Sequence, residues 1–286
     1  MIIVNFCGGL GNQMFQYATY RKLKELGKEV KADLTFYNKN SCELMNVFGI
    51  KLDIATQKDI IKYTDTSRNL ISRFRRRVLH ISLSKILNQQ NHEFVDLNMI
   101  LKKRNLYLNG YWQSEEYFKD IKNIIKEEFR FKNIYDEKNN VIIQKIKKGN
   151  SVSLHVRRGD YLGNPRYENI CTKTYYKNAI KYIKEKEKNI ELFVFSNDIE
   201  WVKNNIKFED KVNYIDWNKG ANNFKDMYLM SKCKHNIIAN SSFSWWGAWL
   251  NENNNKIIMC PEIWFNDDSL DINLFLPKEW TRIGIN

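Results

Sequence analysis

Short apolar runs alternate with segments of helical periodicity through the second half of the chain. The runs at 151–156 and 190–196 have the length of buried strands, and each is followed by a segment whose apolar residues recur every three or four positions. Strands that alternate with helices predict a parallel, doubly wound α/β sheet. The expected strands are 151–156, 190–196, 212–216, 235–240 and 256–261, and the expected helices are 173–186, 198–206, 222–233 and 242–251.

The first residues follow the same plan. The apolar run 2–6 predicts a strand, the glycine-rich stretch after it predicts a turn, and a helical pattern then continues to Gly27, which suits a helix end. A second strand is expected at 29–34. Strand, loop, helix and strand in this order are typical of an α/β domain.

The middle of the first half is polar and predicts helices over most of 55–105. Within it, 67–87 predicts a basic, amphipathic helix. We favour a solvated helix with one buried stripe, and the alternative is a surface that meets an anionic membrane or an acceptor carrier. A strand, a turn and a helix start are expected at 106–118, and a helix at 117–131.

The length of 286 residues is ample for two domains, and no Gly/Ser-rich linker separates them. The polar segment 145–150 ends in Gly-Asn. We therefore expect two closely joined domains, 1–148 and 149–286.

The chain is basic, with a net charge of +13 and a pI near 9.3. This charge favours anionic partners such as nucleotides, nucleic acids or anionic membranes, although a general bias towards Lys, Asn and Ile would give the same excess. Five cysteines without a C-x-x-C spacing and four scattered histidines form no metal pattern. The sequence shows no signal-peptide pattern and no apolar run of membrane-spanning length, so a cytoplasmic location is expected.

The stretch SVSLHVRRGDY, residues 151–161, places charged residues at the end of a predicted buried strand. Alternate side chains of a strand share a face. One face is therefore expected to carry Val152, Leu154 and Val156, and the other Ser153, His155 and Arg157. Arg158 and Asp160 then fall at the carboxyl end, with Gly159 allowing the chain to turn.

Ligands of open α/β sheets bind outside the carboxyl ends of the strands. Two guanidinium groups there suit a phosphate or pyrophosphate, because the planar fork donates paired, charge-assisted hydrogen bonds. A purely structural Arg–Asp pair is the alternative.

Two further strand ends add polar side chains to the same edge. The candidates are Ser196, Asn197 and Asp198 after one strand, and Asn240, Ser241, Ser242 and Ser244 at the start of a helix. Residues at a helix start suit phosphate binding or simple N-capping. The tryptophans that follow are expected in the core rather than stacked on a ligand; they are Trp245, Trp246 and Trp249.

The stretch GGLGNQ, residues 8–13, has the glycines of a nucleotide-binding loop but fits neither common pattern. It lacks the small third residue of the dinucleotide fingerprint and the Gly-Lys-Ser/Thr of the P-loop. Its backbone amides at a helix start could still face a phosphate or a sugar across an interdomain cleft.

Five motifs in order resemble the bacterial α-1,2-fucosyltransferases of glycosyltransferase family 11: GGLGNQMFQYA, GYWQSEEYF, HVRRGDY, FSNDIEWVKNN and NSSFSWWGAWLN. They run from residue 8 to 251, and HVRRGDY matches the H-x-R-R-x-D signature of other fucosyltransferases. The resemblance implies a GT-B-like α/β fold, with two Rossmann-like doubly wound domains facing a cleft. The N-terminal domain would hold the acceptor and the C-terminal domain the GDP-sugar.

The same resemblance implies a reaction. The donor would be GDP-β-L-fucose, the acceptor the 2-hydroxyl of a β-galactoside, and the anomeric centre would be inverted in one displacement without a cofactor. Arg157 is expected to neutralise the departing pyrophosphate, with Arg158 either assisting or holding Asp160. Further donor contacts are expected from His155, Asn197, Asp198, Asn240, Ser242 and Ser244, and from Gly9, Asn12 and Gln13 in the first domain.

The sequence gives fewer indications of a metal requirement and of the general base. The sequence has no Asp-x-Asp motif, so arginine charge would replace a metal ion and metal independence is predicted. The general base is left open between Asp160, Glu115 and Asp198. We favour a structural pair between Asp160 and Arg158, and a loose transition state could also manage with late proton transfer to phosphate.

Three other functions compete with this interpretation. The charge and aromatic content would suit a nucleic-acid-binding protein, but arginines at strand ends beside Ser and Asp suit a discrete phosphate better, so no nucleic-acid partner is expected. The others are a transferase of the same fold that uses another nucleotide sugar, and a silent lectin-like module. Peripheral contact with a membrane-linked glycan is kept as an alternative, and the natural acceptor and oligomeric state are not predicted.

Overall fold

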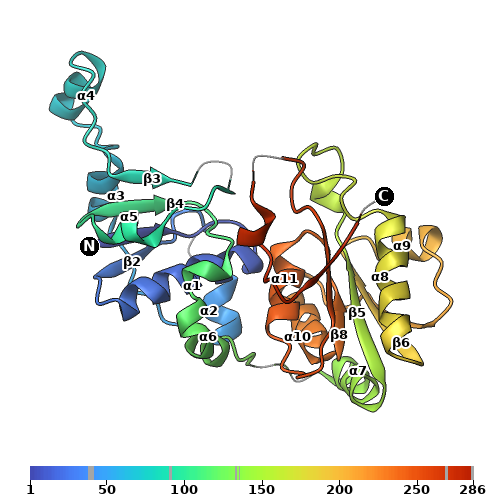
Figure 1. Cartoon of the computed structure of the whole chain (residues 1–286). Coiled ribbons are helices and arrows are strands. Elements are labelled where there is room, and N and C mark those ends of the chain that lie inside the picture. The colour runs from blue at the N-terminus through green and yellow to red at the C-terminus, as the bar shows by residue number, and fades with distance from the viewer. Residues whose placement is uncertain (38–41, 90–91, 133, 135, 268–269, 285–286) are drawn as a thin grey trace. The chain divides into compact units, whose positions relative to one another are not determined.

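The computed structural model describes residues 1–284 except 38–41, 90–91, 133, 135 and 268–269. The chain divides into two compact units, Met1–Arg130 and Phe131–Asn286. Each unit is built on its own parallel sheet (Figure 1). The α/β architecture predicted for both halves is therefore confirmed.

A four-stranded parallel sheet forms the centre of the first unit, in the order β2-β1-β4-β3. β1 is paired on both sides and buries Ile3 and Val4 completely, as strands covered on both faces do. The strands are β1 (Ile2–Asn5), β2 (Val30–Asp33), β3 (Ile86–Asn88) and β4 (Leu106–Asn109), and the helices are α1 (Leu10–Glu25), α2 (Glu43–Phe48), α3 (Gln57–Thr64), α4 (Leu70–Arg77), α5 (Leu97–Leu101) and α6 (Lys122–Glu128).

The second unit holds a six-stranded parallel sheet in the order β10-β9-β8-β5-β6-β7. Its strands are β5 (Asn150–Val156), β6 (Ile190–Ser196), β7 (Lys211–Ile215), β8 (His235–Ile237), β9 (Ile258–Pro261) and β10 (Thr281–Ile283), and its helices are α7 (Glu137–Lys148), α8 (Lys173–Lys186), α9 (Ile199–Asn205), α10 (Phe224–Lys232) and α11 (Ser242–Trp249). All five strands expected from the periodicity are present, and β10 is added at one edge.

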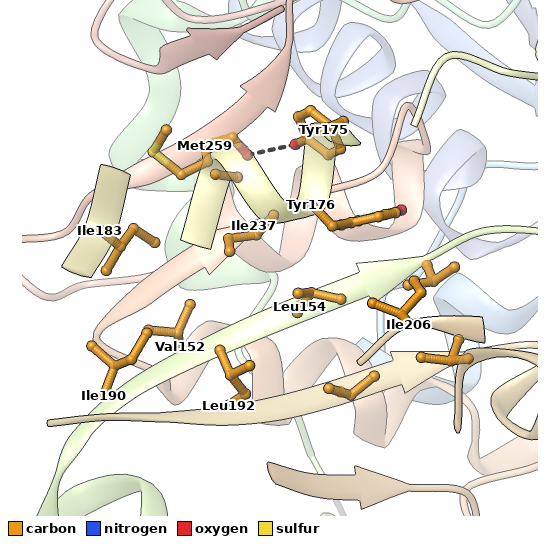
Figure 2. Packing of buried hydrophobic residues seen from close by; sticks show 14 residues of the cluster. Val152, Leu154, Tyr175, Tyr176, Ile183, Ile190, Leu192, Ile206, Ile237 and Met259 are labelled. Atoms are coloured by element: carbon orange, nitrogen blue, oxygen red, sulfur yellow. Dashed lines mark hydrogen bonds between the residues drawn. The ribbon is translucent and has the colours of Figure 1, made fainter. Parts of the chain in front are cut away.

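Helices cover both faces of this sheet, because its inner strands send apolar side chains alternately to each side. Val152 and Leu154 of β5 pack with Tyr176 and Ile183 of α8, as Figure 2 shows. The opposite face packs on α7 and α10 through Ile142, Ile143, Ile146, Phe193, Phe195, Leu229 and Met230. The sheet is therefore doubly wound, and its polar residues are left at the strand ends.

The division between the units lies earlier than the boundary expected at 148/149. α7 belongs with the second sheet, since Ile142, Ile143 and Ile146 pack against Phe193. Residues 145–150 look polar in sequence because this helix buries only one of its faces.

The prediction of a helix at 67–87 is wrong beyond Arg77. α4 ends there, the chain turns with His80 at a φ of +52°, and β3 begins at Ile86. A left-handed residue cannot continue a right-handed helix. The helix expected at 117–131 is also shorter than predicted, because 3-10 turns precede α6.

Candidate functional site

Three loops meet at the carboxyl edge of the second sheet. Val156 of β5 lies opposite Ser196 of β6, and Leu154 lies opposite Ile237 of β8 on the other side. Because the three strands are parallel, residues 157–161, 197–198 and 238–244 leave the sheet at the same edge. We call these residues the edge cluster. The structure thus brings together three motifs that are far apart in the sequence.

Arg157 lies at the centre of the edge cluster. It forms an ion pair with Asp160, with 2.8 Å between Nη2 and Oδ1, and its guanidinium lies 5.5 Å from the centre of the Tyr161 ring. Its Nε is buried and has no hydrogen-bond partner among the described residues. A buried donor of this kind is unfavourable unless an acceptor reaches it, so Arg157 is suited to bind an anionic ligand.

Arg158 turns to a different partner. Its Nε donates to Oδ2 of Asp198 at 3.2 Å, and its guanidinium stacks 3.6 Å from the centre of the Trp201 ring. The pair that we favoured between Arg158 and Asp160 is therefore wrong, since Arg157 takes Asp160. Adjacent residues leave a strand in different directions, which separates the two guanidinium groups.

Asn197 and Gly159 fix the turn that carries these arginines. The side-chain oxygen of Asn197 accepts from the backbone N–H of Arg158 at 2.9 Å. Gly159 has a φ of +54°, and a Cβ there would lie 2.4 Å from Nδ2 of Asn197. Glycine tolerates this backbone conformation and leaves space for the Asn197 side chain. Asn197 therefore supports the backbone of the loop in this structure.

His155 is a buried, neutral histidine. Its side chain is 5% exposed and packs 6.0 Å from the Phe243 ring. Burial, and then the charge of Arg157, lower its pKa to about 3. Its Nδ1 has no hydrogen-bond partner among the described residues. His155 therefore adds no positive charge near neutral pH but keeps a polar atom beneath the edge cluster.

The loop between β8 and α11 is held by its own polar side chains. Asn240 donates to the carbonyls of Tyr167 and Trp264, both at 3.3 Å. Ser244 is 1% exposed, and its hydroxyl lies 3.4 Å from the carbonyl of Ala239. Both residues support the loop in this structure, whereas Ser242 lies at the start of α11, where phosphate contacts were expected.

The tryptophans of α11 are in the core, as predicted. Trp245, Trp246 and Trp249 are buried, and the indole N–H of Trp245 donates to the carbonyl of Phe275 at 2.9 Å. They anchor the helix whose first turn carries Ser242.

Sequence reasoning missed a polar network after β7. Asn218 donates to Oδ1 of Asp226 at 2.8 Å and exchanges hydrogen bonds with Asn139, which also accepts from Trp217. Burial raises the pKa of Asp226 to about 7. In sequence, an acid in the first turn of a helix looks like ordinary capping, so no signal distinguished it.

In the first unit, the GGLGNQ motif surrounds the start of α1. The side chain of Asn12 accepts from Nε2 of Gln113 at 2.8 Å, which joins this motif to GYWQSEEYF. Gln13 is fully buried and accepts from the backbone N–H of Leu44 at 2.9 Å, so it supports the fold. Gly9 lies at the N-cap of α1, and no described side chain caps the helix there.

A pocket of about 750 Å³ opens at the carboxyl end of β2. Its wall includes Asp33, Thr35, Tyr37 and Asn46, and the Tyr37 hydroxyl donates to the carbonyl of Gly8 at 2.6 Å. This pocket adjoins the glycine loop and offers hydroxyl, amide and carboxylate groups with aromatic surface, a lining that suits a sugar.

Within the described residues, no three or more His, Cys, Asp and Glu side chains gather as a metal site. No described helix is long and apolar enough to cross a bilayer.

The fold defines the class of protein. A solved structure of Arabidopsis thaliana FUT1 in complex with GDP matches with a TM-score of 0.53 at 13% identity, covering 94% of this chain and 72% of that one. At this sequence identity the similarity shows the fold alone. The two parallel α/β sheets and this likeness confirm the predicted GT-B-like class.

The sequence comparisons then define the family. The model of Glycosyl transferase family 11 matches residues 1–284, so the chain belongs to this family of transferases. It is 35% identical to an alpha-1,2-colitosyltransferase of Escherichia coli, covering 99% of each chain. It is 33% identical to the O-antigen biosynthesis glycosyltransferase WbnK of Escherichia coli, covering 90% of this chain and 93% of that one. Galactoside alpha-(1,2)-fucosyltransferase 1 of Pan troglodytes is 28% identical, covering 85% and 63%.

Proposed function

We propose that this transferase moves L-fucose from GDP-β-L-fucose to the 2-hydroxyl of a β-galactoside. Family membership and the names of the fucosyltransferase relatives support the reaction class. The observation that carries the proposal is Arg157, whose buried Nε has no hydrogen-bond partner among the described residues and lies at the edge where α/β sheets bind their ligands.

The proposed mechanism is a single displacement with inversion. The acceptor oxygen attacks the anomeric carbon, and the bond from that carbon to the β-phosphate oxygen breaks, so its electron pair moves onto GDP. The proton of the acceptor hydroxyl passes to a carboxylate base or to the departing phosphate. Arg157 would neutralise this growing charge, which is the contribution that preorganised donors make to such reactions. Asp160 would position Arg157 through their 2.8 Å ion pair.

Base recognition and phosphate contacts would surround Arg157. We assign Ser242, at the start of α11, to a phosphate oxygen, and His155 and Asp198 to the nucleoside side of the site. His155 is neutral, so it can accept or donate a hydrogen bond without adding charge. Arginine charge would serve in place of a metal ion, so we propose metal-independent transfer.

Asp160 has a second candidate role as general base, because its side chain is 62% exposed beside Arg157. The pH–rate profile of Asp160→Asn separates the roles. Loss of the acidic limb of the profile would identify a base, whereas a lower kcat with an unchanged profile would identify a positioning residue.

The pocket of the first unit is our proposed acceptor site. Asn46 and Thr35 would contact acceptor hydroxyls, and Tyr37 would offer an aromatic surface. Asn46→Ala should raise the KM for the acceptor and leave the KM for the donor unchanged.

A specific observation favours a second donor. The colitosyltransferase relative is 35% identical over nearly the whole chain, and colitose is fucose without its 3-hydroxyl group. A site built to hydrogen-bond that hydroxyl would strongly reject GDP-colitose. We therefore propose to measure kcat/KM for GDP release with GDP-fucose, GDP-colitose and GDP-mannose. A preference for GDP-fucose supports the proposal, and a preference for GDP-colitose replaces the donor.

A further inference from the structure

Residues 66–86 of the first unit, which we call the arm, expose large apolar side chains. Figure 1 shows α4 projecting away from the sheet of its own unit. Leu70 and Ile71 are each 81% exposed, and Phe74 is 57% exposed. The exposed apolar residues of the arm are Leu70, Ile71, Phe74, Val78, Leu79, Ile81, Leu83 and Ile86. Apolar surface on this scale marks an interaction site.

The base of the arm is fastened by one carboxylate. Asp65 pairs with Arg75 and Arg76, and it accepts from the backbone N–H of Leu83 at 2.9 Å. These two arginines and the carboxylate therefore hold the shape of the arm.

The remaining arginines of α4 lie beside the apolar face. At 3.6 residues per turn, Leu70, Ile71 and Phe74 share one side of the helix, and Arg73 and Arg77 border it. Arg73 and Arg77 are exposed and have no ion-pair partner among the described residues. The sequence from Thr66 to His92 contains no Asp or Glu that could neutralise them.

We propose that the arm docks on an anionic lipid bilayer. Leu70, Ile71 and Phe74 enter the boundary between headgroups and acyl chains, and Arg73 and Arg77 meet the lipid phosphates. A second copy of the arm fits less well, because two such faces would bring unneutralised arginines together. This proposal does not rest on the donor, the acceptor or the transfer reaction.

Flotation of the full chain with lipid vesicles tests the proposal. One vesicle contains phosphatidylglycerol and phosphatidylethanolamine, and the other contains phosphatidylcholine alone. The chain should float with the anionic vesicles only. Replacing Arg73 and Arg77 together by Gln should weaken partitioning by about fivefold per charge, and L70S/F74S should reduce it to background.

Matched variants separate the arm from general properties of the surface. Lys147→Gln with Lys148→Gln removes the same charge from exposed positions of α7, and Met99→Ser with Val141→Ser removes exposed apolar side chains elsewhere. Both control pairs should bind like the wild type, and circular dichroism should show all variants folded.

Three results would overturn the proposal: no flotation of the wild type, flotation of L70S/F74S equal to the wild type, or equal loss in the control pairs. A wild-type dimer in sedimentation that L70S/F74S converts to monomer would assign the arm to self-association instead. Transfer activity is measured separately on a soluble acceptor, so failure of docking is distinguishable from failure of the proposed reaction.

Discussion

The edge cluster and the arm both contain neighbouring arginines, and in each region an aspartate separates their roles. In the edge cluster, Asp198 holds Arg158, while Arg157 keeps a buried donor that has no partner in the part of the chain that the structure describes. In the arm, Asp65 holds Arg75 and Arg76, while Arg73 and Arg77 stay exposed. Neighbouring arginines therefore do not act as one functional unit. The nearby aspartate pairs with some of them, and only the others remain available to bind a ligand or a surface.

The surroundings of the two regions differ. The edge cluster stands on strands whose side chains are buried on both faces, so its donors are fixed in place. The arm is largely exposed to solvent, so its apolar residues bury only part of their surface within their own unit. Fixed donors suit recognition of one small anion, whereas an exposed apolar and basic face suits an extended surface.

The largest expected effect is on kcat, and it should distinguish the arginines of the edge cluster from those of the arm. Arg157→Ala should lower kcat by about 100- to 1,000-fold, because it removes a preorganised charge from the leaving group. Arg73→Ala in the arm should leave kcat on a soluble acceptor unchanged. Steady-state kinetics with both substrates saturating checks this pair, and equal losses would show that the arginines act only through overall charge.

The second effect concerns the acid stability of the edge. The pKa of His155 is lowered in the folded state, so the unfolded chain binds the extra proton between pH 6.5 and about 3. The contribution of His155 to the free energy of unfolding should therefore fall by about 1.4 kcal/mol per pH unit as the pH drops through this window. Urea unfolding of wild type and His155→Leu measures this contribution, because the pH dependences of the two proteins should differ by this slope. His80→Asn, in the arm, is the control and should keep the slope.

The third effect has the opposite sign. The pKa of Asp226 is raised to about 7, so the folded chain retains a proton that the unfolded chain loses above pH 3.8. Stability from this group should decline by up to about 1.4 kcal/mol per pH unit as the pH rises from 3.8 towards 7. Asp226→Asn should flatten that decline, and an unchanged slope in urea titrations would rule out this carboxyl as its source.

The smallest expected effect is on stability, and it concerns Arg158 and Arg76, which are each paired with an aspartate. Arg158→Ala removes a stacked cation and an ion pair, which should lower stability by about 1 kcal/mol. The ion pair of Arg76 with Asp65 is longer, at 3.4 Å. Arg76→Ala should therefore lower stability by about half as much as Arg158→Ala, or less. Thermal melts of both variants check the order, and a larger loss for Arg76→Ala would contradict it.

Much of the second sheet could be predicted because its strands are continuous apolar runs between helical segments. β6 at Ile190–Ser196 and α8 at Lys173–Lys186 have the predicted bounds. The first unit was harder, because its strands are short and β3 is partly exposed. The choice of Asp160 as partner of Arg157 depends on the direction in which each side chain leaves the turn at Gly159, which residue types do not encode.

Polar residues in motifs gave a mixed outcome. Arg157 and Ser242 lie where the motifs placed them, at the carboxyl edge. Ser244 lies in the same motif as Ser242, and Gln13 lies in the glycine-rich motif, but both bond to backbone groups in the interior. A motif records which residue types are required, and only the structure shows whether a side chain faces a ligand or supports the loop.

One measurement tests the central claim most directly. The purified chain is incubated with GDP-fucose and lactose in excess EDTA, and the product is examined by mass spectrometry beside that of Arg157→Ala. We predict a fucosylated trisaccharide from the wild type and almost none from the variant, with the variant folded by circular dichroism. Full activity of Arg157→Ala, or wild-type transfer that appears only when a divalent metal ion replaces EDTA, would contradict the account.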